Sequence, residues 1–499
     1  MSTYDADVVI IGSGFGGSIS ANRLALAGLK VLVLERGPWR DSLPIRSMGI
    51  ARRAPFPYGM KAVTHLLRNV HFRRSSLMLN KSGLYEVFRY AGLDVFAASA
   101  VGGGSHGWFG MLVEPQDSAY WKGRHPELDP LELEKYYAKI VADMGGVRIS
   151  QHLPHSIWTQ LPGSSGRRCL PADPQPYMAV KVPNSKSEVG QVTEGDEGMK
   201  RQTCAFDGDG FMGSRGGAKA SVDFIYLAPV LNKGATVRDM CEVTKIIRNS
   251  TANPAEYAVH FTGLRDGQKE VVRTKRVILA AGTINTLRLL FANSLEPGSL
   301  APMASLGRTF GGNGDFIGAW FKNSSESPVF ESAPVLGRFK VDGQDAPLLG
   351  MWALAGIDTV PLLPGWKKKL AKIVPLIGMG ADTGKASASF EKGRLVVDYD
   401  PNQEPIFDKI REAFRVLETE TGLKTWAIKK PITVHAWGGA CLGPTPDRGV
   451  VDHNGEVFGN PGLFVADASA LPAAVGTPPS LALAAWAHHV ADGLAQRAA

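Results

Sequence analysis

Three short segments of the chain are almost entirely apolar, one near its start, one in its middle and one near its end. They read DVVII at residues 7–11, RVILAA at 276–281 and GLFVA at 462–466. Continuous apolar runs of this length are typical of strands that are covered on both faces in a parallel sheet. Because the segments lie far apart in the sequence, we predict one domain assembled from separated pieces, with a second domain inserted between them.

The first of these segments begins a βαβ unit. A glycine-rich turn follows the strand, a helical pattern runs from Ser18 to Ala27, Gly28 ends it, and a second strand occupies residues 31–35. Farther along the chain we predict three helices, strand-and-turn patterns over 205–310 and short strands within 314–435. The helices are expected at residues 131–144, at 405–421 and from 479 to about 495.

The composition excludes several classes of protein. The 499 residues are 44% hydrophobic and 20% charged, which is ordinary for a globular protein and excludes a largely disordered chain. A net charge of +8 is mild at this length, and without a recognisable reader module we expect no nucleic acid partner. The four cysteines form no C-x-x-C pair, so we expect no metal site and reduced thiols, as in a cytoplasmic protein. We see neither a signal peptide nor a membrane-spanning segment.

The turn after the first strand has the spacing of a dinucleotide-binding motif, Gly12-x-Gly14-x-x-Gly17. Gly12 permits a tight turn, Gly14 lets the backbone approach a pyrophosphate at the start of the helix, and Gly17 lets the helix pack closely on the strand. Glu35 ends the second strand, where a carboxylate accepts hydrogen bonds from a ribose and repels the 2′-phosphate of NADP. This unit predicts a bound dinucleotide but does not choose between NAD and FAD.

The segment near the end of the chain favours FAD. Residues 462–467 form an apolar strand that ends in the carboxylate of Asp467, and this resembles the second FAD fingerprint of flavoproteins with two dinucleotide-binding domains. In those proteins the acid meets the ribityl or pyrophosphate part of FAD. The alternative is a structural role for Asp467 as the cap of a turn or helix.

Four stretches of the sequence form a further pattern: residues 9–17, VGGGS at 101–105, VILAAGT at 277–283, and a tail from HAWGG at 435–439 through GVVD at 449–452 to PSL at 479–481. These stretches resemble the glucose-methanol-choline (GMC) oxidoreductase family, and most closely its cholesterol-oxidase-like branch. They follow in family order, and the tail is the most specific of them.

The resemblance implies oxidation of an alcohol by hydride transfer to FAD, which we expect to be bound non-covalently. His435 matches the active-site histidine of the family, and an imidazole suits the role of base because histidine titrates near neutral pH. The alternative for His435 is a hydrogen-bonded structural residue. Cofactor contacts are expected at Gly12, Gly14, Phe15, Gly17, Glu35, Gly102, Gly103, Gly104, Ser105, Trp108, Val243, Gly282, Asp467 and Pro479.

The expected fold is therefore α/β, with a Rossmann-like FAD-binding domain built from discontinuous segments and an inserted α+β substrate domain with an antiparallel sheet. We assign residues 1–122, 205–313 and 435–499 to the FAD-binding domain. We assign residues 123–204 and 314–434 to the substrate domain. The first part of the FAD-binding domain includes a lid-like basic segment at 40–85.

The chain departs from the family pattern in three places. Pro478 stands where the family usually has Asn or His as its second active-site residue, and a proline side chain offers no hydrogen bond, so Thr477 or a residue from elsewhere must supply that contact. Trp108 stands at the position of a family asparagine, and His106 lies one residue too far from Trp108 to match relatives that attach FAD covalently. Residues 348–352 contain no counterpart of the isomerising glutamate of steroid-oxidising members.

The branch resemblance and the apolar pieces between residues 314 and 380 indicate a small hydrophobic alcohol, sterol- or terpenoid-like, as the substrate. The electron acceptor is oxygen or another molecule that the sequence does not identify. Because of Pro478, a flavoprotein with non-redox lyase or isomerase activity is the alternative function, and a flavin-binding protein without catalytic activity is a third.

The role of two basic patches has two interpretations. Residues 46–74 contain seven lysines and arginines and no acid, interleaved with apolar residues, and WKKKLAK follows at 366–372. They are either solvated surface loops, or a lid and a docking patch that contact anionic lipids and collect an apolar substrate. The second reading places the protein at the periphery of a membrane.

Overall fold

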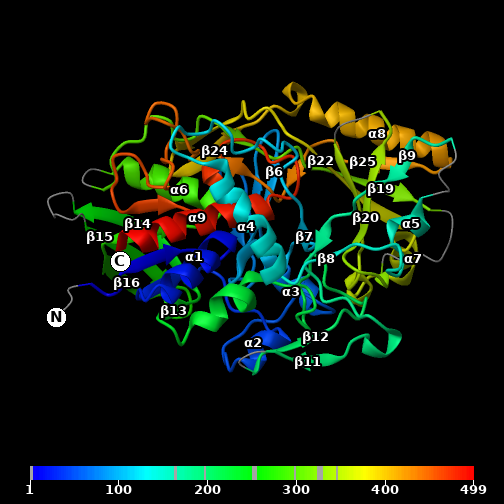
Figure 1. Cartoon of the computed structure of the whole chain (residues 1–499), viewed down its shortest axis with the longest axis horizontal. Coiled ribbons are helices and arrows are strands. Elements are labelled where there is room, and N and C mark those ends of the chain that lie inside the picture. Colours follow the sequence, from blue (N-terminus) through cyan, green and yellow to red (C-terminus); the bar gives the residue numbers. More distant parts are fainter. Residues whose placement is uncertain are drawn as a thin grey trace.

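The computed structural model describes residues 4–498 except 162–165, 196–197, 250–255, 297–298, 323–329 and 344–346. Helices and strands are mixed along the whole chain, and the segments at its start, middle and end lie together in one half of the molecule (Figure 1). The predicted α/β class is confirmed. None of the helices in these described ranges is long and apolar enough to cross a membrane.

A parallel five-stranded sheet forms the centre of that half, in the order β13-β2-β1-β17-β28. Its apolar side chains on β1, β2, β17 and β28 are buried, as continuous apolar runs require. The sheet therefore joins three separated parts of the chain, as the sequence predicted. The strands are β1 (Val8–Ile11), β2 (Val31–Leu34), β13 (Ala235–Arg238), β17 (Arg276–Leu279) and β28 (Leu463–Val465).

Four helices and a small sheet surround this core. Helix α1 packs on α9, and α9 packs on α4, while α6 leads directly from the end of β17 and contacts β14. The helices are α1 (Phe15–Leu26), α4 (Pro130–Asp143), α6 (Thr283–Ser294) and α9 (Ser480–Ala498), and the antiparallel sheet is β14 (Cys241–Asn249), β15 (Glu256–Gly263) and β16 (Lys269–Thr274).

The other half of the molecule contains an antiparallel six-stranded sheet in the order β25-β19-β22-β21-β20-β9, with α8 (Ile406–Thr421) against it (Figure 1). The helix lies close because Gly318 and Gly378 have no side chains there: a Cβ on them would come within 2.6 Å of Phe414 and 2.5 Å of Ile410. The strands are β9 (Cys169–Pro171), β19 (Phe316–Phe321), β20 (Val335–Val341), β21 (Leu348–Trp352), β22 (Ile373–Met379) and β25 (Thr425–Ala427). The assigned domain boundaries stay predictions.

A third sheet joins strands from residues 67–98 to a short strand at residues 432–433. Its order is β26-β6-β5-β3-β4, and β26 pairs in parallel with β6 through Ile432 and Asp94. This pairing brings the segment of His435 next to the first part of the chain. The strands are β3 (Leu67–His71), β4 (Ser76–Met78), β5 (Tyr85–Arg89), β6 (Asp94–Ala98) and β26 (Ile432–Thr433).

Short elements complete the described chain. The helices are α2 (Leu43–Ser47), α3 (Lys61–His65), α5 (Ile157–Gln160) and α7 (Pro364–Leu370). The strands are β7 (Met111–Leu112), β8 (Val147–Arg148), β10 (Tyr177–Met178), β11 (Val192–Glu194), β12 (Lys200–Gln202), β18 (Phe310–Gly311), β23 (Ser387–Glu391), β24 (Arg394–Asp398) and β27 (Trp437–Gly438).

The predicted long helices are confirmed, but the start of the first was wrong. Helix α1 begins at Phe15 and not at Ser18, so Gly16 and Gly17 belong to the helix. A Cβ on Gly16 would collide with the carbonyl oxygen of Ala466, and one on Gly17 with that of Gly12. The two glycines are therefore helical residues that allow close packing, although glycine is a poor helix former.

Candidate cofactor and active site

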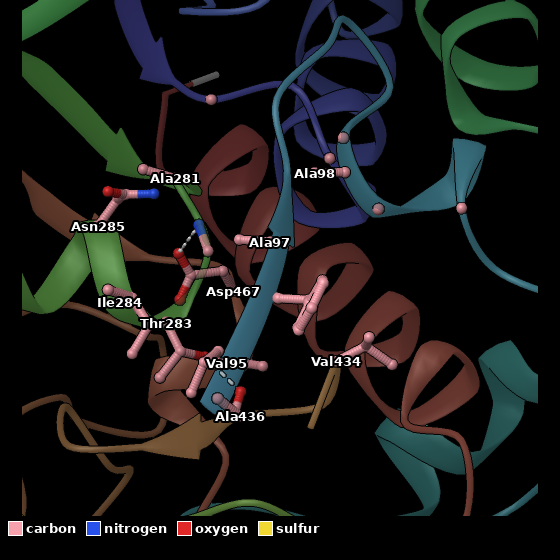
Figure 2. A pocket seen from close by; sticks show the side chains of 18 of the residues that line it. Val95, Ala97, Ala98, Ala281, Thr283, Ile284, Asn285, Val434, Ala436 and Asp467 are labelled. Carbon is pink, nitrogen blue, oxygen red and sulfur yellow. Dashed lines mark hydrogen bonds between the residues drawn. The ribbon is translucent and has the colours of Figure 1, made fainter. Parts of the chain in front are cut away.

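A cavity of about 930 Å³ lies where several separated segments of the chain meet. Its walls come from the glycine-rich turn after β1, the ends of β2 and β17, strand β6, and the segments around His435 and Pro478. In Figure 2, Asp467 lies beside the turn between Ala281 and Thr283, and β6 passes across the cavity with Val95 and Ala97. The same cavity thus contains the predicted dinucleotide motif and the predicted active-site histidine.

Two glycine-rich segments meet at one wall of this cavity. Gly12 has a φ of +96°, which favours glycine, and a Cβ there would collide with the carbonyl oxygen of Ala280. Gly103, with a φ of +52°, lies so close to the turn that its Cβ would come within 2.7 Å of the Gly14 Cα. By contrast, a Cβ on Gly104 would meet nothing within 4 Å, so the backbone here faces open space. Such a bare backbone beside a helix N-terminus suits an anionic group.

Glu35 is buried at the end of β2, where it faces the same cavity. Its Oε2 accepts hydrogen bonds from the Ser13 backbone N–H at 3.0 Å and hydroxyl at 2.8 Å, and its Oε1 accepts one from the Gly37 N–H at 2.7 Å. Burial raises the pKa of this carboxyl, while these hydrogen bonds act in the opposite direction. A carboxylate has about four lone-pair sites, so one remains for a donor such as a ribose hydroxyl.

Asp467 has the structural role that the sequence left open, while its contact with the cofactor stays a prediction. Its Oδ1 accepts from the Ser469 backbone N–H at 2.9 Å, which caps the short turn of residues 468–470. Its Oδ2 accepts from the Gly282 N–H at 2.9 Å and from the Thr286 hydroxyl, and this fixes the start of α6 (Figure 2). The residue also lines the cavity. Burial raises the pKa of its carboxyl.

His435 lies between β26 and β27 with its ring at the cavity wall. Its Nδ1 lies 2.9 Å and 3.0 Å from the two carboxylate oxygens of Asp315. The histidine side chain is 17% exposed and the aspartate side chain 4% exposed, so the ring reaches the cavity while its partner is buried behind it. Sequence reasoning missed Asp315, because 120 residues separate it from His435.

Much of the lining of the cavity is apolar. Aromatic and aliphatic side chains from the six-stranded sheet and from the segments around residues 109 and 211 form part of its walls. They include Phe109, Met111, Phe211, Ile317, Trp352, Leu354, Ile377 and Met379.

Two family models described as GMC oxidoreductase match residues 191–299 and 386–487, and a model of an FAD binding domain matches residues 5–54. This chain belongs to the GMC oxidoreductase family. The predicted family and the predicted cofactor, FAD, are thereby confirmed.

Curated relatives of this GMC oxidoreductase match it over nearly its full length at low identity. A cholesterol oxidase of Acinetobacter baumannii is 24% identical over 98% of this chain and 94% of its own. A cholesterol oxidase of Mycobacterium tuberculosis is also 24% identical, over 98% of this chain and 91% of its own. A long-chain-alcohol oxidase of Arabidopsis thaliana is 22% identical over 97% of this chain and 67% of its own.

Solved structures of similar fold cover the whole molecule. The crystal structure of a pyridoxine 4-oxidase from Mesorbium loti gives a TM-score of 0.59 at 16% identity, over 98% of this chain and 99% of that one. A fungal aryl-alcohol oxidase gives a TM-score of 0.58 at 16% identity, over 99% of this chain and 100% of that one. At these identities the likeness shows the fold alone. Together with the match to an FAD binding domain, it confirms the predicted fold class, a Rossmann-like FAD-binding domain joined to a second domain.

The residues present fit FAD. The bare backbone at Gly104 and the open space beside Gly282, where a Cβ would also meet nothing within 4 Å, form a cradle along the cavity. Glu35 and Val243 line one part of this cavity, and His435 lines another. Most of the predicted cofactor contacts lie on its walls, namely Gly12, Gly14, Phe15, Glu35, Gly103, Gly104, Trp108, Val243, Gly282, Asp467 and Pro479.

Three predicted cofactor contacts, Gly17, Gly102 and Ser105, are not among the residues that line the cavity. Gly17 packs α1 against the turn after β1. The Ser105 hydroxyl donates to the Gly102 carbonyl at 2.7 Å and accepts from the Val222 N–H at 3.1 Å. These residues therefore support the loop that forms the cradle.

The family departures have clear places in the structure. Pro478 lines the cavity, whereas the Thr477 hydroxyl donates to the Glu114 carbonyl at 2.9 Å and is not on the cavity wall. Thr477 therefore does not supply the second polar contact. The Trp108 indole N–H donates to the Ala220 carbonyl at 3.0 Å, while its ring faces the edge of Phe15 at 5.1 Å.

His106 is buried away from the cavity. Its Nε2 lies 2.6 Å from the Val101 carbonyl and 3.7 Å from Asp223, and burial lowers its pKa. This placement supports the expectation of non-covalent FAD. Among the residues that the structure describes, no group of three or more His, Cys, Asp or Glu side chains could hold a metal ion.

Proposed function

We propose that this GMC oxidoreductase oxidises a hydrophobic alcohol, sterol- or terpenoid-like, to a carbonyl compound. The observation that carries the proposal is the position of His435, on the wall of an apolar chamber that continues into the FAD cradle. The names of the cholesterol and long-chain-alcohol oxidases support an alcohol with a large apolar body. Burial of such a body in this chamber is favourable by about 25 cal/mol per Å².

In the proposed reaction, His435 removes the proton of the substrate hydroxyl through Nε2. The carbinol C–H bond then breaks, its hydrogen leaves as hydride with both bonding electrons, and the C–O bond becomes a carbonyl. FAD, when bound, supplies the hydride acceptor. The apolar walls keep water away from the reacting carbon, and Pro478 leaves His435 without the second polar residue that other family members have.

The first experiment adds alcohols anaerobically to the purified holoenzyme while the visible spectrum of the flavin is recorded. The panel contains a sterol, a terpenoid alcohol, a long-chain alcohol and, as matched hydrophilic controls, short alcohols and sugars. We expect an apolar alcohol to bleach the flavin and the hydrophilic alcohols not to. In the His435→Gln variant the rate of bleaching should fall by about 10²- to 10⁴-fold, with flavin content unchanged.

The same experiment distinguishes the alternative function, a non-redox lyase or isomerase, which the proline at position 478 favours. Product that forms without bleaching would replace the oxidation proposal with this alternative. Flavin that no alcohol bleaches, with no product from any of them, would contradict both. Readmission of air after bleaching tests oxygen as the acceptor, which the names of the relatives as oxidases support.

We further propose that a surface formed by α3 and α7, the α3–α7 surface, contacts anionic lipids. Met60, Val63, Leu363 and Trp366 are exposed there by 58% to 71%. Lys61, Lys368 and Lys369 are exposed on the same two segments, and the Lys369 ammonium lies 5.1 Å from the centre of the Trp366 ring. The Gly59 N–H donates to the Thr359 hydroxyl at 3.0 Å, which joins the segments before the two helices.

The position of this surface suits delivery of an apolar substrate, because Leu66 and Leu67, directly after α3, line the cavity. Other parts of the basic segment serve the fold: Arg40 and Arg68 are buried, and Arg68 pairs with Glu86. We expect the protein to float with vesicles that contain anionic lipid and much less with neutral vesicles. A Met60→Ser, Trp366→Ser double variant should lose most of this binding, and equal flotation of both proteins would contradict the proposal.

A further inference from the structure

Asp315 lies directly before β19, in a turn that contacts both sides of the active site. The turn comprises Gly312, Asn313, Gly314 and Asp315 and leads into β19. Asn313 and Gly314 have φ values of +58° and +62°, so two successive residues adopt left-handed backbone. A Cβ on Gly314 would collide with the carbonyl oxygen of Gly380. The conformation of this turn is therefore strongly constrained.

Asn313 attaches the turn to the loop that carries Pro478. Its Oδ1 accepts from the Gly476 N–H at 2.8 Å, and its Nδ2 donates to the Thr477 carbonyl at 2.9 Å. Asp315, two residues later, contacts the opposite segment. The turn at residues 312–315 thus contacts both the loop that carries Pro478 and the segment of His435, and it fixes their positions relative to each other.

The hydrogen bonds of Asp315 determine which nitrogen of His435 carries a proton. The carboxylate accepts from the Thr433 hydroxyl at 2.8 Å and from the Val434 N–H at 3.1 Å, in addition to Nδ1 of His435. An ionised carboxylate only accepts, so Nδ1 must bear the hydrogen. In the neutral ring, Nε2 then has a free lone pair, as a base requires.

We propose that Asp315 is a positioning residue for the reaction: it holds His435 in the Nδ1–H tautomer and stabilises the imidazolium that forms when Nε2 takes the proton of the alcohol. This rests on the proposed function for the identity of the proton donor. The proton taken from the alcohol stays on Nε2 of His435, and the Nδ1–H bond remains intact. Asp315 stays ionised, so the step needs no further reactant. Asp315 is not on the cavity wall, and it therefore acts through the histidine.

Because position 478 is a proline, the stabilisation of His435 by Asp315 becomes more important. In a site with two polar side chains, the second can share the charge that develops around the substrate oxygen. Here the side chain of Pro478 has no hydrogen-bonding group, and the Thr477 hydroxyl donates to the Glu114 carbonyl. A buried carboxylate behind the base is then the nearby group that can compensate the positive charge on the ring, and such an interaction is strong where water is excluded.

Asp382, which contacts the same turn from another segment of the chain, offers a matched control. Asp382 is also buried, its Oδ2 accepts from the Gly312 N–H at 2.5 Å, and its Oδ1 accepts from the Trp437 indole N–H at 2.9 Å. It does not line the cavity. Burial raises the pKa of Asp382 to about 7. An amide at this position can accept only one of the two N–H groups, so the substitution should cost stability without touching the cavity.

The test compares Asp315→Asn with Asp382→Asn in the FAD-loaded enzyme. We expect Asp315→Asn to lower the rate constant of flavin reduction at saturating alcohol by about 10²- to 10³-fold, because the amide permits the wrong tautomer. The dissociation constant of the alcohol should change less than about threefold, since Asp315 does not touch it. Asp382→Asn should melt at a lower temperature but retain a rate constant within about threefold of the unsubstituted enzyme.

A second measurement needs no substrate and no variant that might fold poorly. Nitrogen NMR of the FAD-loaded protein with ¹⁵N-labelled histidine, assigned with His435→Gln, should show a protonated Nδ1 and an unprotonated Nε2 in the neutral ring. The opposite tautomer would overturn the proposal even if the enzyme oxidises alcohols. Equal rate losses in both aspartate variants would also overturn it, because the effect would then be structural. Absence of any alcohol-dependent bleaching, with the expected tautomer present, would instead contradict the proposed function.

Discussion

At the scale of single residues, Gly103 and Gly104 are neighbours with opposite surroundings. Gly103 touches the Gly14 backbone, whereas Gly104 faces the open cavity. We therefore expect Gly104→Ala to leave the melting temperature of the FAD-free protein unchanged and to weaken FAD binding by tenfold or more, because its methyl group enters the cradle. Thermal melting of the FAD-free protein measures the first quantity, and calorimetric titration of that protein with FAD measures the second. Gly365→Ala on α7, also without neighbours within 4 Å, is the control. Unchanged FAD affinity in Gly104→Ala would show that FAD does not use this wall.

A second prediction at this scale concerns the stability of the fold in acid. His488 on α9 is fully buried and stacks on Tyr136 at 4.9 Å, and burial lowers its pKa to about 4. The unfolded chain binds this proton near pH 6.5 and the folded chain near pH 4, so stability falls as the pH drops through that interval. The loss amounts to about 2 to 3 kcal/mol between pH 7 and pH 4.5.

His488→Phe should remove this pH dependence, because the phenyl ring keeps the stacking and cannot be protonated. The melting temperature measured at pH 7 and at pH 4.5 should therefore differ less in the variant than in the unsubstituted protein. An equal difference in both proteins would assign the acid sensitivity to other groups.

Several site residues could be predicted from the sequence because local spacing places them. Gly12, Gly14 and Glu35 belong to one βαβ unit, and Asp467 follows an apolar strand, so their positions relative to the sheet follow from the chain itself. Asp315 could not be found in this way. Its contact with His435 depends on where the turn before β19 packs, and no local pattern contains that information.

At the scale of elements, one aspartate joins three helices. Asp492 on α9 pairs with Arg23 on α1 through two nitrogens at 2.6 Å and 3.2 Å, and it accepts the Tyr136 hydroxyl of α4 at 2.7 Å. The arginine side chain is 34% exposed and the aspartate side chain 20%, so water screens part of the attraction. Asp492→Ala should lower the free energy of unfolding by about 1 to 2 kcal/mol.

The control for this prediction is Glu412→Ala, which removes a more exposed pair with Arg415 within α8. Thermal melting should show a clear decrease for Asp492→Ala and almost none for the control. Equal melting temperatures for the two variants would mean that packing alone holds α1, α4 and α9 together.

Element boundaries show where local reading of the sequence was insufficient. Gly16 and Gly17 indicated a loop because glycine is a poor helix former, but they lie in α1 and pack tightly against Ala466 and Gly12. Strand β26 has two residues, and its pairing with β6 is decided by contacts more than 300 positions apart. Both cases depend on tertiary structure, whereas the long helices and buried strands were predictable from their periodicity.

At the scale of the whole molecule, the cavity connects segments from the start, middle and end of the chain, so FAD should stabilise the complete fold. A ligand present at about a thousand times its dissociation constant contributes about 4 kcal/mol. We expect removal of FAD to lower the melting temperature and added FAD to restore it. FMN lacks the adenosine part that would reach Glu35, and it should restore much less. Full recovery with FMN would show that the Glu35 end of the cavity does not bind the cofactor.

The fold itself does not identify the substrate. Two of the solved structures with almost complete coverage are named for different activities, a pyridoxine 4-oxidase and an aryl-alcohol oxidase. The proposal of a hydrophobic alcohol therefore depends on the apolar side chains of the cavity and on the relatives that match over the full length. Several of these side chains belong to strands that the sequence indicated only as short apolar patterns.

The strand order of the parallel sheet has a consequence for the synthesis of the protein. β17 pairs with β28, and about 180 residues separate them in the chain. At ~5 to 20 residues per second, a ribosome needs about 10 to 40 seconds to make that stretch. Throughout this time β17 presents an unpaired apolar edge, of the kind that other chains can join. Newly made molecules should therefore depend on chaperones, and FAD supplied during translation should act only after the ribosome has passed the final strand.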